Sequence, residues 1–252
     1  MIITFLGTGT SQGVPVIACN CKVCRSDDPV NRRLRSSVHI AHNSSSLVID
    51  SGPDFRQQML RENITRLDAV LLTHQHRDHI AGLDDVRSFN FIQNKAMPVY
   101  GSQSVIDQLK LEFHYAFENN YPGVPQFDIH EITENPLDIS GISVLPIEFT
   151  HYQMPVYGFR IEDFTYITDA NYISPESYNK IEGTNTLVIN ALHKTRHISH
   201  FNLEQALEVI DKLQPKQAYL THISHNMGLH WEVEKELPNH VHLAYDGLKI
   251  EV

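Results

Sequence analysis

The chain has 252 residues, of which 41% are hydrophobic, and this is long enough for a sizeable core. Its formal net charge of −10 argues against a broad binding surface for nucleic acid, so nucleic acid is not an expected partner. The sequence contains no apolar run approaching the roughly 18 residues that cross a bilayer. It also begins without the basic region of a signal peptide. We therefore expect no membrane partner and a cytoplasmic protein.

No linker, composition shift or repeat divides the sequence, so residues 1–252 are predicted to form one domain. A first strand is expected at residues 2–6, followed by a glycine-rich loop at residues 7–13. That loop lacks the lysine and the following helix of a phosphate-binding loop. The oligomeric state stays open, with a homodimer as the assembly to consider.

Three cysteines come next, and all of them lie within one short segment: Cys19, Cys21 and Cys24. An odd number of such closely spaced cysteines fits a disulfide framework poorly. Three thiolates in one loop instead supply three of the four ligands of a tetrahedral zinc site. The alternatives are reduced cysteines without a ligand and a transient redox pair.

A basic cluster follows at residues 32–37, where three arginines precede two serines. Such clusters are typical of a solvated face. A phosphate-facing role is the alternative, because arginine forks match the geometry of phosphate.

The densest group of potential ligands follows an apolar strand that is predicted over residues 69–72. It is the stretch His74-Gln75-His76-Arg77-Asp78-His79. Imidazole nitrogens and a carboxylate together suit a borderline cation such as zinc. Along an extended chain His74 and His76 share one face, whereas Asp78 and His79 turn elsewhere. The loop can therefore serve two adjacent cations, and a solvated polar loop is the alternative.

Helices are predicted in both halves of the chain. In the first half they cover residues 54–61, 83–93 and 103–118, with a loop of no assigned role at residues 119–126. A short helix starts at Ser174, and a longer one follows Asn202, which with Gln205 forms a capping-box pattern. Two strands are expected around the turn at residues 246–247.

Five predicted strands share one feature: a histidine or an aspartate stands at the carboxyl end of each. Besides the strand before His74, these are the strands that precede Asp50, His151, Asp169 and His222. One instance is commonplace, whereas five are better explained by strands that converge on one site.

The stretch from His74 to His79 is similar to the H-x-H-x-D-H motif of the metallo-β-lactamase superfamily. This resemblance implies an α/β (α+β) fold, the four-layer αββα sandwich, with two divalent metals at one edge. Asp50 resembles a support that orients the ligand loop. The ligand set that the resemblance implies is His74, His76 and His151 for one metal, Asp78, His79 and His222 for the other, and Asp169 bridging both.

The predicted chemistry follows from such a pair of cations. Two cations about 3.5–4 Å apart can hold a bridging hydroxide at neutral pH and neutralise a phosphodiester. We predict His200 and Asp78 as catalytic residues. His200 is chosen as the general acid because it precedes a helix on a loop that can reach the site, with His197 as the competing choice. Zinc and manganese both suit these ligands.

The cysteine loop, together with the stretch from Thr221 to His225, resembles the PhnP-like phosphodiesterase branch of the superfamily. In that branch a structural zinc takes three cysteines and a histidine, which implies His225 as the fourth ligand. The expected activity is hydrolysis of a small phosphodiester, cyclic diesters included. The alternatives are a thioester hydrolase of the glyoxalase II kind, a ribonuclease Z-like RNA phosphodiesterase, and a non-enzymatic scaffold.

Overall fold

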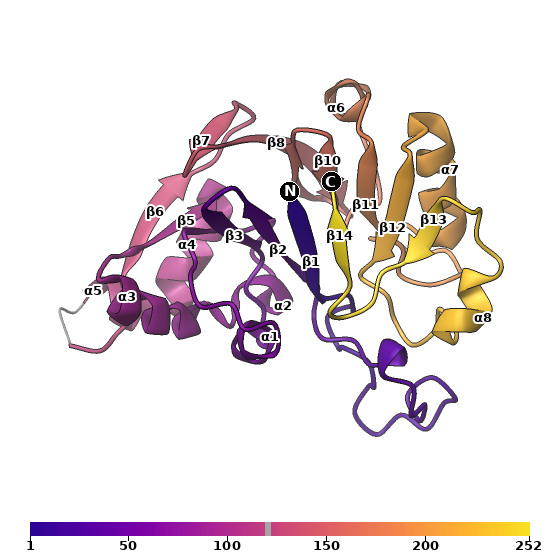
Figure 1. Ribbon diagram of the computed structural model, residues 1–252, viewed down its shortest axis with the longest axis horizontal. Coiled ribbons are helices and arrows are strands. Elements are labelled where there is room, and N and C mark those ends of the chain that lie inside the picture. Colours follow the sequence, from indigo (N-terminus) through magenta and orange to yellow (C-terminus); the bar gives the residue numbers. More distant parts are fainter. Residues whose placement is uncertain (119–121) are drawn as a thin grey trace.

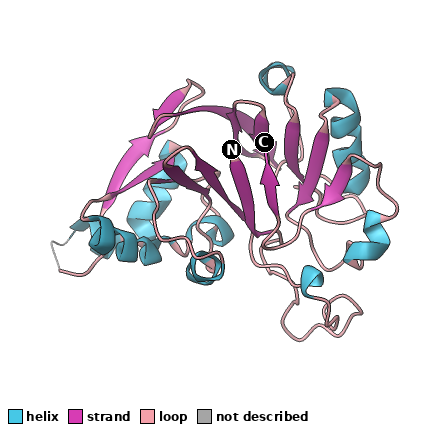
Figure 2. Cartoon of the chain, in the orientation of Figure 1, coloured by secondary structure: helices cyan, strands magenta, loops and turns pink. Residues whose placement is uncertain are grey.

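Two seven-stranded sheets lie face to face, and helices cover the outer side of each in this computed structural model (Figures 1 and 2). The structure describes residues 1–118 and 122–252. Residues 119–121, which belong to the loop expected at residues 119–126, lie outside the described residues. The arrangement is the four-layer sandwich expected from the sequence, so that prediction is confirmed.

The first sheet is built mostly from the first half of the chain. Its strands, in spatial order, are β14 (Lys249–Glu251), β1 (Ile2–Gly7), β2 (Ser37–His42), β3 (Ser45–Ile49), β4 (Ala69–Leu71), β5 (Met97–Gly101) and β6 (Phe127–Glu131). The helices that pack on it are α1 (Phe55–Arg61), α2 (Arg77–Ile80), α3 (Arg87–Gln93), α4 (Gln103–Glu112) and α5 (His114–Glu118).

The second sheet comes from the second half of the chain. Its order is β13 (Val241–Leu243), β12 (Gln217–Thr221), β11 (Thr186–Asn190), β10 (Phe164–Tyr166), β9 (Met154–Ile161), β8 (Ile142–His151) and β7 (Leu137–Ile139). Figure 1 shows its helices on the side opposite those of the first sheet. They are α6 (Pro175–Ile181), α7 (Leu203–Leu213) and α8 (His230–Glu234).

Side-chain alternation along the strands produces three apolar layers. In β3, Leu47 and Ile49 point between the sheets, whereas Val48 points to the helices of the first sheet. The middle layer also takes Phe159 and Tyr166 from the second sheet. A third layer lies between the second sheet and α6 and α7. Because successive side chains of a strand alternate between faces, an apolar strand buried on both sides contributes side chains to two apolar layers.

The direction of the strands decides where the site lies. Strands β3 and β4 are parallel, and so are β10, β11 and β12. Strand β8 also runs parallel to β10, because both pair with β9 in the antiparallel sense. The carboxyl ends of these strands therefore meet at one edge of the sandwich, as the strand-end pattern of the sequence predicts.

Several elements differ from the sequence-based predictions. The helix expected at residues 83–93 is a 3₁₀ turn, η2 (Leu83–Val86), followed by α3, and the one expected at 103–118 breaks at Phe113. The two strands around residues 246–247 exist, but β13 and β14 belong to different sheets. Another short 3₁₀ turn, η1, spans Pro29–Asn31. Within residues 1–118 and 122–252, no helix combines the length and apolar character needed to cross a membrane.

Candidate functional site

The edge of the sandwich gathers seven histidine and aspartate side chains, which we call the strand-end site: His74, His76, Asp78, His79, His151, Asp169 and His222. Two groups of potential ligands lie within it. His74, His76 and His151 form the first group, and the remaining four residues form the second. These are the residues that the sequence selected, and the fold brings all of them together.

The first group consists of three imidazoles, and two of them, His74 and His151, hold their protons on nitrogens that face away from the group. His151 Nδ1 donates to the carbonyl oxygen of Ser199 at 2.7 Å, which leaves Nε2 with its lone pair. His74 Nδ1 lies 2.9 Å from the Thr73 hydroxyl, which itself donates to Asp50. Burial lowers the pKa of both His74 and His151, so both stay neutral. The free nitrogens of this group are thus available to a cation.

The second group is held from behind by Asp50, which is fully buried. Its carboxylate accepts from His79 Nδ1 at 2.6 Å and from the amide and hydroxyl of Thr73 at 2.9 Å. His79 Nε2 is left without a hydrogen-bond partner among the described residues. It faces the carboxylates of Asp78 and Asp169 at 3.2 Å and 3.3 Å.

The spacing of these donors fits a divalent cation. Two ligands at about 2.1 Å from one cation lie about 3.0–3.4 Å apart, depending on the coordination angle. The separations are 3.2 Å between His222 Nδ1 and Asp169 Oδ2, and 3.1 Å between His74 Nε2 and His76 Nδ1. An orphaned buried nitrogen among carboxylates at such distances is the donor set that a cation requires.

The electrostatics of the second group favour a positive charge. Burial opposes a charged imidazole, but the carboxylates of Asp78, Asp50 and Asp169 raise the pKa of His79 well above its ordinary value. Burial also disfavours ionised Asp169, yet His222 and His79 keep its pKa well below the usual range. The carboxylates of Asp78 and Asp169 therefore stay ionised, and a cation would neutralise them.

Asp169 lies between the two groups of ligands. It belongs to the second group, and it also lies close to His151 of the first group and to His200. His200 Nε2 is 3.1 Å from Asp169 Oδ1, and its side chain is only 12% exposed. His197 is exposed and contacts His200 Nδ1 from behind at 3.2 Å. Of the two histidines considered for the acid, only His200 reaches the strand-end site.

Three strand-end residues have left-handed backbones, namely Asp50, Asp169 and His222, with φ of 65°, 59° and 56°. Residues other than glycine rarely adopt this conformation, which persists where the surrounding structure imposes it. Each of the three follows a buried strand and turns sharply there. The turn aims its side chain across the edge of the sandwich.

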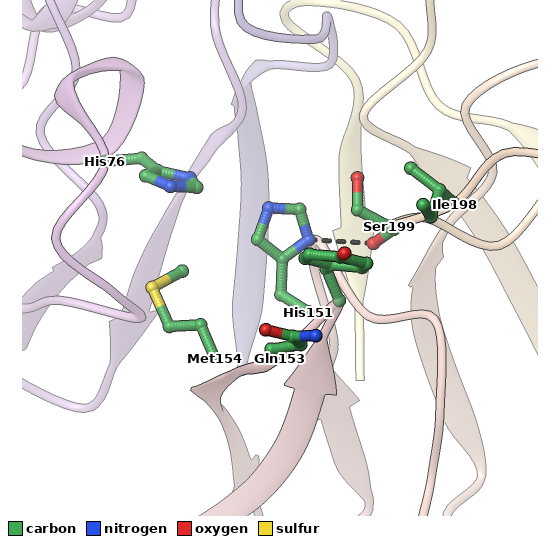
Figure 3. A pocket seen from close by; sticks show the side chains of 7 residues that line it. His76, His151, Gln153, Met154, Ile198 and Ser199 are labelled. Atoms are coloured by element: carbon green, nitrogen blue, oxygen red, sulfur yellow. Dashed lines mark hydrogen bonds between the residues drawn. The ribbon is translucent and has the colours of Figure 1, made fainter.

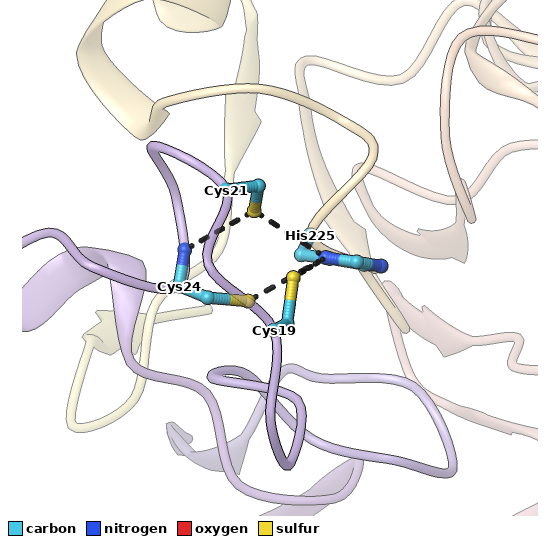
Figure 4. A group of neighbouring side chains, drawn as sticks. All are labelled: Cys19, Cys21, Cys24 and His225. Atoms are coloured by element: carbon cyan, nitrogen blue, oxygen red, sulfur yellow. Dashed lines mark hydrogen bonds between the residues drawn. The ribbon is translucent and has the colours of Figure 1, made fainter.

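The cysteines form a separate cluster with His225, which we call the cysteine site (Figure 4). The sulfurs of Cys19, Cys21 and Cys24 lie 3.3, 3.5 and 3.5 Å from His225 Nδ1. A tetrahedral zinc with ligands at about 2.3 Å (sulfur) and 2.0 Å (nitrogen) would separate them by about 3.5 Å. The amide of Cys24 lowers the pKa of Cys21 to about 6, whereas burial raises that of Cys24 to about 11. A cation would hold all three as thiolates.

The basic cluster of residues 32–37 has neither of the roles considered for it as a whole. Arg33 is buried and donates to Thr8 and His230. Arg35 pairs with Asp54 at 3.2 Å. Nothing in the sequence singles out Ser36, yet its hydroxyl lies 3.3 Å from His222 Nδ1. Asn171, which joins two loops beside the site, was missed as well, because its contacts arise only from tertiary structure.

Comparison with known proteins places the chain in a family. Residues 46–223 match the family described as "Beta-lactamase superfamily domain". A crystal structure of "a New Diphosphatase from the PhnP Family" is 38% identical, with a TM-score of 0.93, covering 100% of this chain and 97% of that one. Human short-form tRNase Z shares 18% identity at a TM-score of 0.75, with 100% and 99% covered, which shows the fold alone.

A curated relative is longer than this chain. The "Octanoyltransferase" of Porphyromonas gingivalis is 39% identical over 248 residues, which are 97% of this chain and 50% of that protein. The chain therefore spans about half the length of this curated relative. The family match and the PhnP-family structure confirm the resemblance seen in the sequence. The chain belongs to the beta-lactamase superfamily and, within it, to the PhnP family.

Proposed function

We propose that this chain is a dinuclear metal-dependent phosphodiesterase that hydrolyses a small phosphodiester, cyclic diesters included. The observation that carries the proposal is the pair of neighbouring ligand groups, in which Asp169 of the second group also lies close to His151 of the first. Three imidazoles on one side, and two carboxylates with two imidazoles on the other, suit two divalent cations of the zinc or manganese kind. The PhnP-family relative is described as a diphosphatase, so a diphosphate linkage is a close chemical variant to test.

In this proposal His74, His76 and His151 bind one cation, Asp78, His79 and His222 bind the other, and Asp169 bridges them. When bound, the cations supply a hydroxide nucleophile at neutral pH and neutralise the phosphate. Asp50 orients His79 and, through Thr73, the loop that carries His74. Such supporting contacts fix the imidazole that donates its lone pair.

His200 has the role of general acid in this proposal. Its Nε2 points to Asp169, and its Nδ1 lies 3.0 Å from the hydroxyl of Ser199. A proton on Nε2 is therefore already directed towards the carboxylate that lies between the two ligand groups. His200 Nε2 would give this proton directly to the oxygen that leaves the phosphorus, so that Asp169 stays ionised.

The cysteine site is proposed to hold a structural zinc, which takes no part in the reaction. All four of its donors are used by the site itself, which is typical of a closed structural centre. The three cysteines are free thiols, so the proposal fits a reducing compartment such as the cytoplasm. We also propose that residues 1–252 act as one domain.

A thioester hydrolase is the second candidate, because the same ligands serve that reaction and one curated relative bears an acyl-transfer name. The deciding experiment is a panel assay of the metal-loaded protein on cyclic diesters, linear diesters, diphosphates, a short RNA and acyl thioesters. We expect the diesters to be the best substrates. Faster turnover of thioesters, or of RNA, would replace the proposal with that alternative.

The acid is tested with two ester substrates. His200→Ala should keep both active-site cations and lose about a hundredfold in rate on a diester with an alkoxide leaving group. It should lose much less on a nitrophenyl ester, whose leaving group hardly needs a proton. The matched control is His197→Ala, which we expect to act like the wild type on both esters. Equal losses on both esters in His200→Ala would exclude the role of acid.

A further inference from the structure

We propose that the pocket beside His76 and His151 binds a neutral, flat ring of the substrate, such as a nucleobase on the sugar of a phosphodiester. The pocket has a volume of about 390 Å³, which is enough for a group of this size. It is shown in Figure 3, and its lining consists of His76, His151, Tyr152, Gln153, Met154, Ile198 and Ser199. The inference rests on the proposed function, because it names the group that the substrate carries.

The pocket and the strand-end site share two walls. His76 and His151 belong to the first ligand group and also line the pocket. A phosphodiester held at the strand-end site would therefore carry one of its ester groups directly into this pocket. The binding preference of the pocket therefore selects which ester group the substrate carries.

The chemistry of the lining excludes a second phosphate. Among the lining residues there is no lysine, arginine or acidic side chain. Tyr152 and Ile198 are 52% and 68% exposed, so two large apolar surfaces face solvent at the rim of the site. Large apolar side chains left open beside a reaction centre are suited to covering an apolar part of the ligand.

Tyr152 occupies a position that the backbone does not favour for it. It is the first residue of the two-residue turn between β8 and β9, with φ of 58°. Glycine is the usual residue at the first position of such turns when φ is positive. A bulky side chain kept in this conformation is a mark of a functional constraint.

Asn171 ties the two apolar walls together. Its side-chain oxygen accepts from the Tyr152 amide at 2.7 Å, and its side-chain nitrogen donates to the Ile198 carbonyl at 3.3 Å. The turn of the β8–β9 hairpin and the loop before His200 are thus joined through one residue. The pocket is held in shape before any ligand arrives, which lowers the cost of binding.

A ring fits this lining better than an alkyl chain does. The Tyr152 ring offers a face for stacking, and stacking a base on an aromatic side chain is tolerant of the base but selective for flat groups. The exposed amide of Gln153 can both donate to and accept from the polar edge of a heterocycle. An alkyl chain would make no hydrogen bond with that amide, which would stay with water.

The experiment compares two substrates that differ only in the ring. These are adenosine 2′,3′-cyclic phosphate and 1-O-methylribose 2′,3′-cyclic phosphate, with the 1-O-octyl compound as the alkyl test. Tyr152→Gly removes the ring and suits the positive φ, so the variant should melt no lower than the wild type. We expect it to lose about tenfold to a hundredfold in kcat/KM on the adenosine compound, mainly through KM, and little on the methyl compound.

Two further variants sharpen the comparison. Tyr152→Phe should retain the preference, because the aromatic face remains. Tyr172→Ala is the matched control, since Tyr172 is 54% exposed but lines a different pocket. A second readout does not depend on turnover: adenosine titrated into the zinc-loaded protein should shift the methyl signal of Met154, and Tyr152→Gly should abolish the shift.

The outcomes separate this inference from the proposed function. If the methyl compound and every other diester resist hydrolysis, the proposed function fails, while the adenosine titration still tests the pocket. If the diesters are cleaved but Tyr152→Gly loses equally on both compounds, the ring pocket is wrong. A preference for the octyl compound, or a Met154 signal that adenosine leaves unmoved, would overturn it as well.

Discussion

The strand-end site and the cysteine site differ in the parts of the chain that supply their ligands. The strand-end site takes its residues from both sheets, across positions 74 to 222, and each is supported by strands and hydrogen bonds. The cysteine site takes three of four ligands from one loop. That loop has no strand within residues 16–26, and its sulfurs accept from the amides of Val16 and Cys24.

This difference predicts different consequences of losing metal. The strand-end residues keep their positions through the fold, so removing a cation there should cost activity more than structure. The loop of the cysteine site has little else to hold it, so zinc and local folding are coupled there. The strand-end site depends on the fold, whereas zinc at the cysteine site stabilises the local fold.

The largest effect is expected at Asp169. Asp169→Asn removes the charge of the carboxylate that is proposed to lie between the two cations. A loss of several kcal/mol of transition-state stabilisation corresponds to about a thousandfold or more in kcat. The fold should remain, because strands β8 and β10 are unaltered. Measuring turnover, metal content and melting temperature of the same preparation checks this. A variant with full metal content and near-normal rate would show that Asp169 does not connect the two groups.

A smaller and mixed effect is expected at His225. The wild type should contain about three metals per chain, and His225→Ala or Cys21→Ser should lose the structural one. His222 and His225 lie on one short segment, so His225→Ala should also weaken active-site metal binding, by about tenfold. Excess zinc or manganese should then restore activity. If the variant kept all its metals with unchanged affinity, the link between the two sites would be wrong.

The last prediction concerns the loss of folding stability at acidic pH, which does not involve the ligands of either site. His230 is buried, and Arg33 donates to its Nδ1 at 3.1 Å. Burial, followed by the charge of Arg33, lowers the pKa of His230 to about 4, from about 6.5 in the unfolded chain. Above pH 6.5 the group is neutral in both states and contributes nothing.

As the pH falls from about 6.5 to about 4, only the unfolded chain takes up the proton. The free energy of unfolding is therefore about 2 kcal/mol lower at pH 5 than at neutral pH. His230→Gln keeps an acceptor for Arg33 and should flatten this part of the pH profile. Denaturant unfolding at pH 7.5 and pH 5, with the metals held saturating, measures it. Parallel pH profiles for the variant and the wild type would assign the acid sensitivity to other groups.

The sequence was most informative where one strand determines one ligand. Apolar runs ending at Asp50, Asp169 and His222 were visible because a buried strand and its polar end are local features. Strand β9 was not predicted, since Pro155, Gly158 and Arg160 interrupt any alternation. Strand β6 also escaped prediction, because it has no buried residue to mark a face.

The contacts that orient the ligands could not be predicted from the sequence. The role of Asn171 depends on two loops meeting, and that of Ser36 on the position of His222. A basic cluster such as residues 32–37 gives no sign that one of its arginines is buried. Ligand types in a known order can be recognised from sequence, whereas the residues that orient them are known only from the packed structure.

The division of the strand-end site between the sheets has a mechanical consequence. His74, His76, Asp78 and His79 follow β4 of the first sheet, whereas His151, Asp169 and His222 follow strands of the second. The Tyr157 amide of β9 also donates to the Thr73 carbonyl, at 2.9 Å, across this seam. Cations bound here would act as cross-links between the two halves of the sandwich. A chelator would then remove a link between the halves as well as stop a reaction, and the loss of stability should be smaller than the loss of activity.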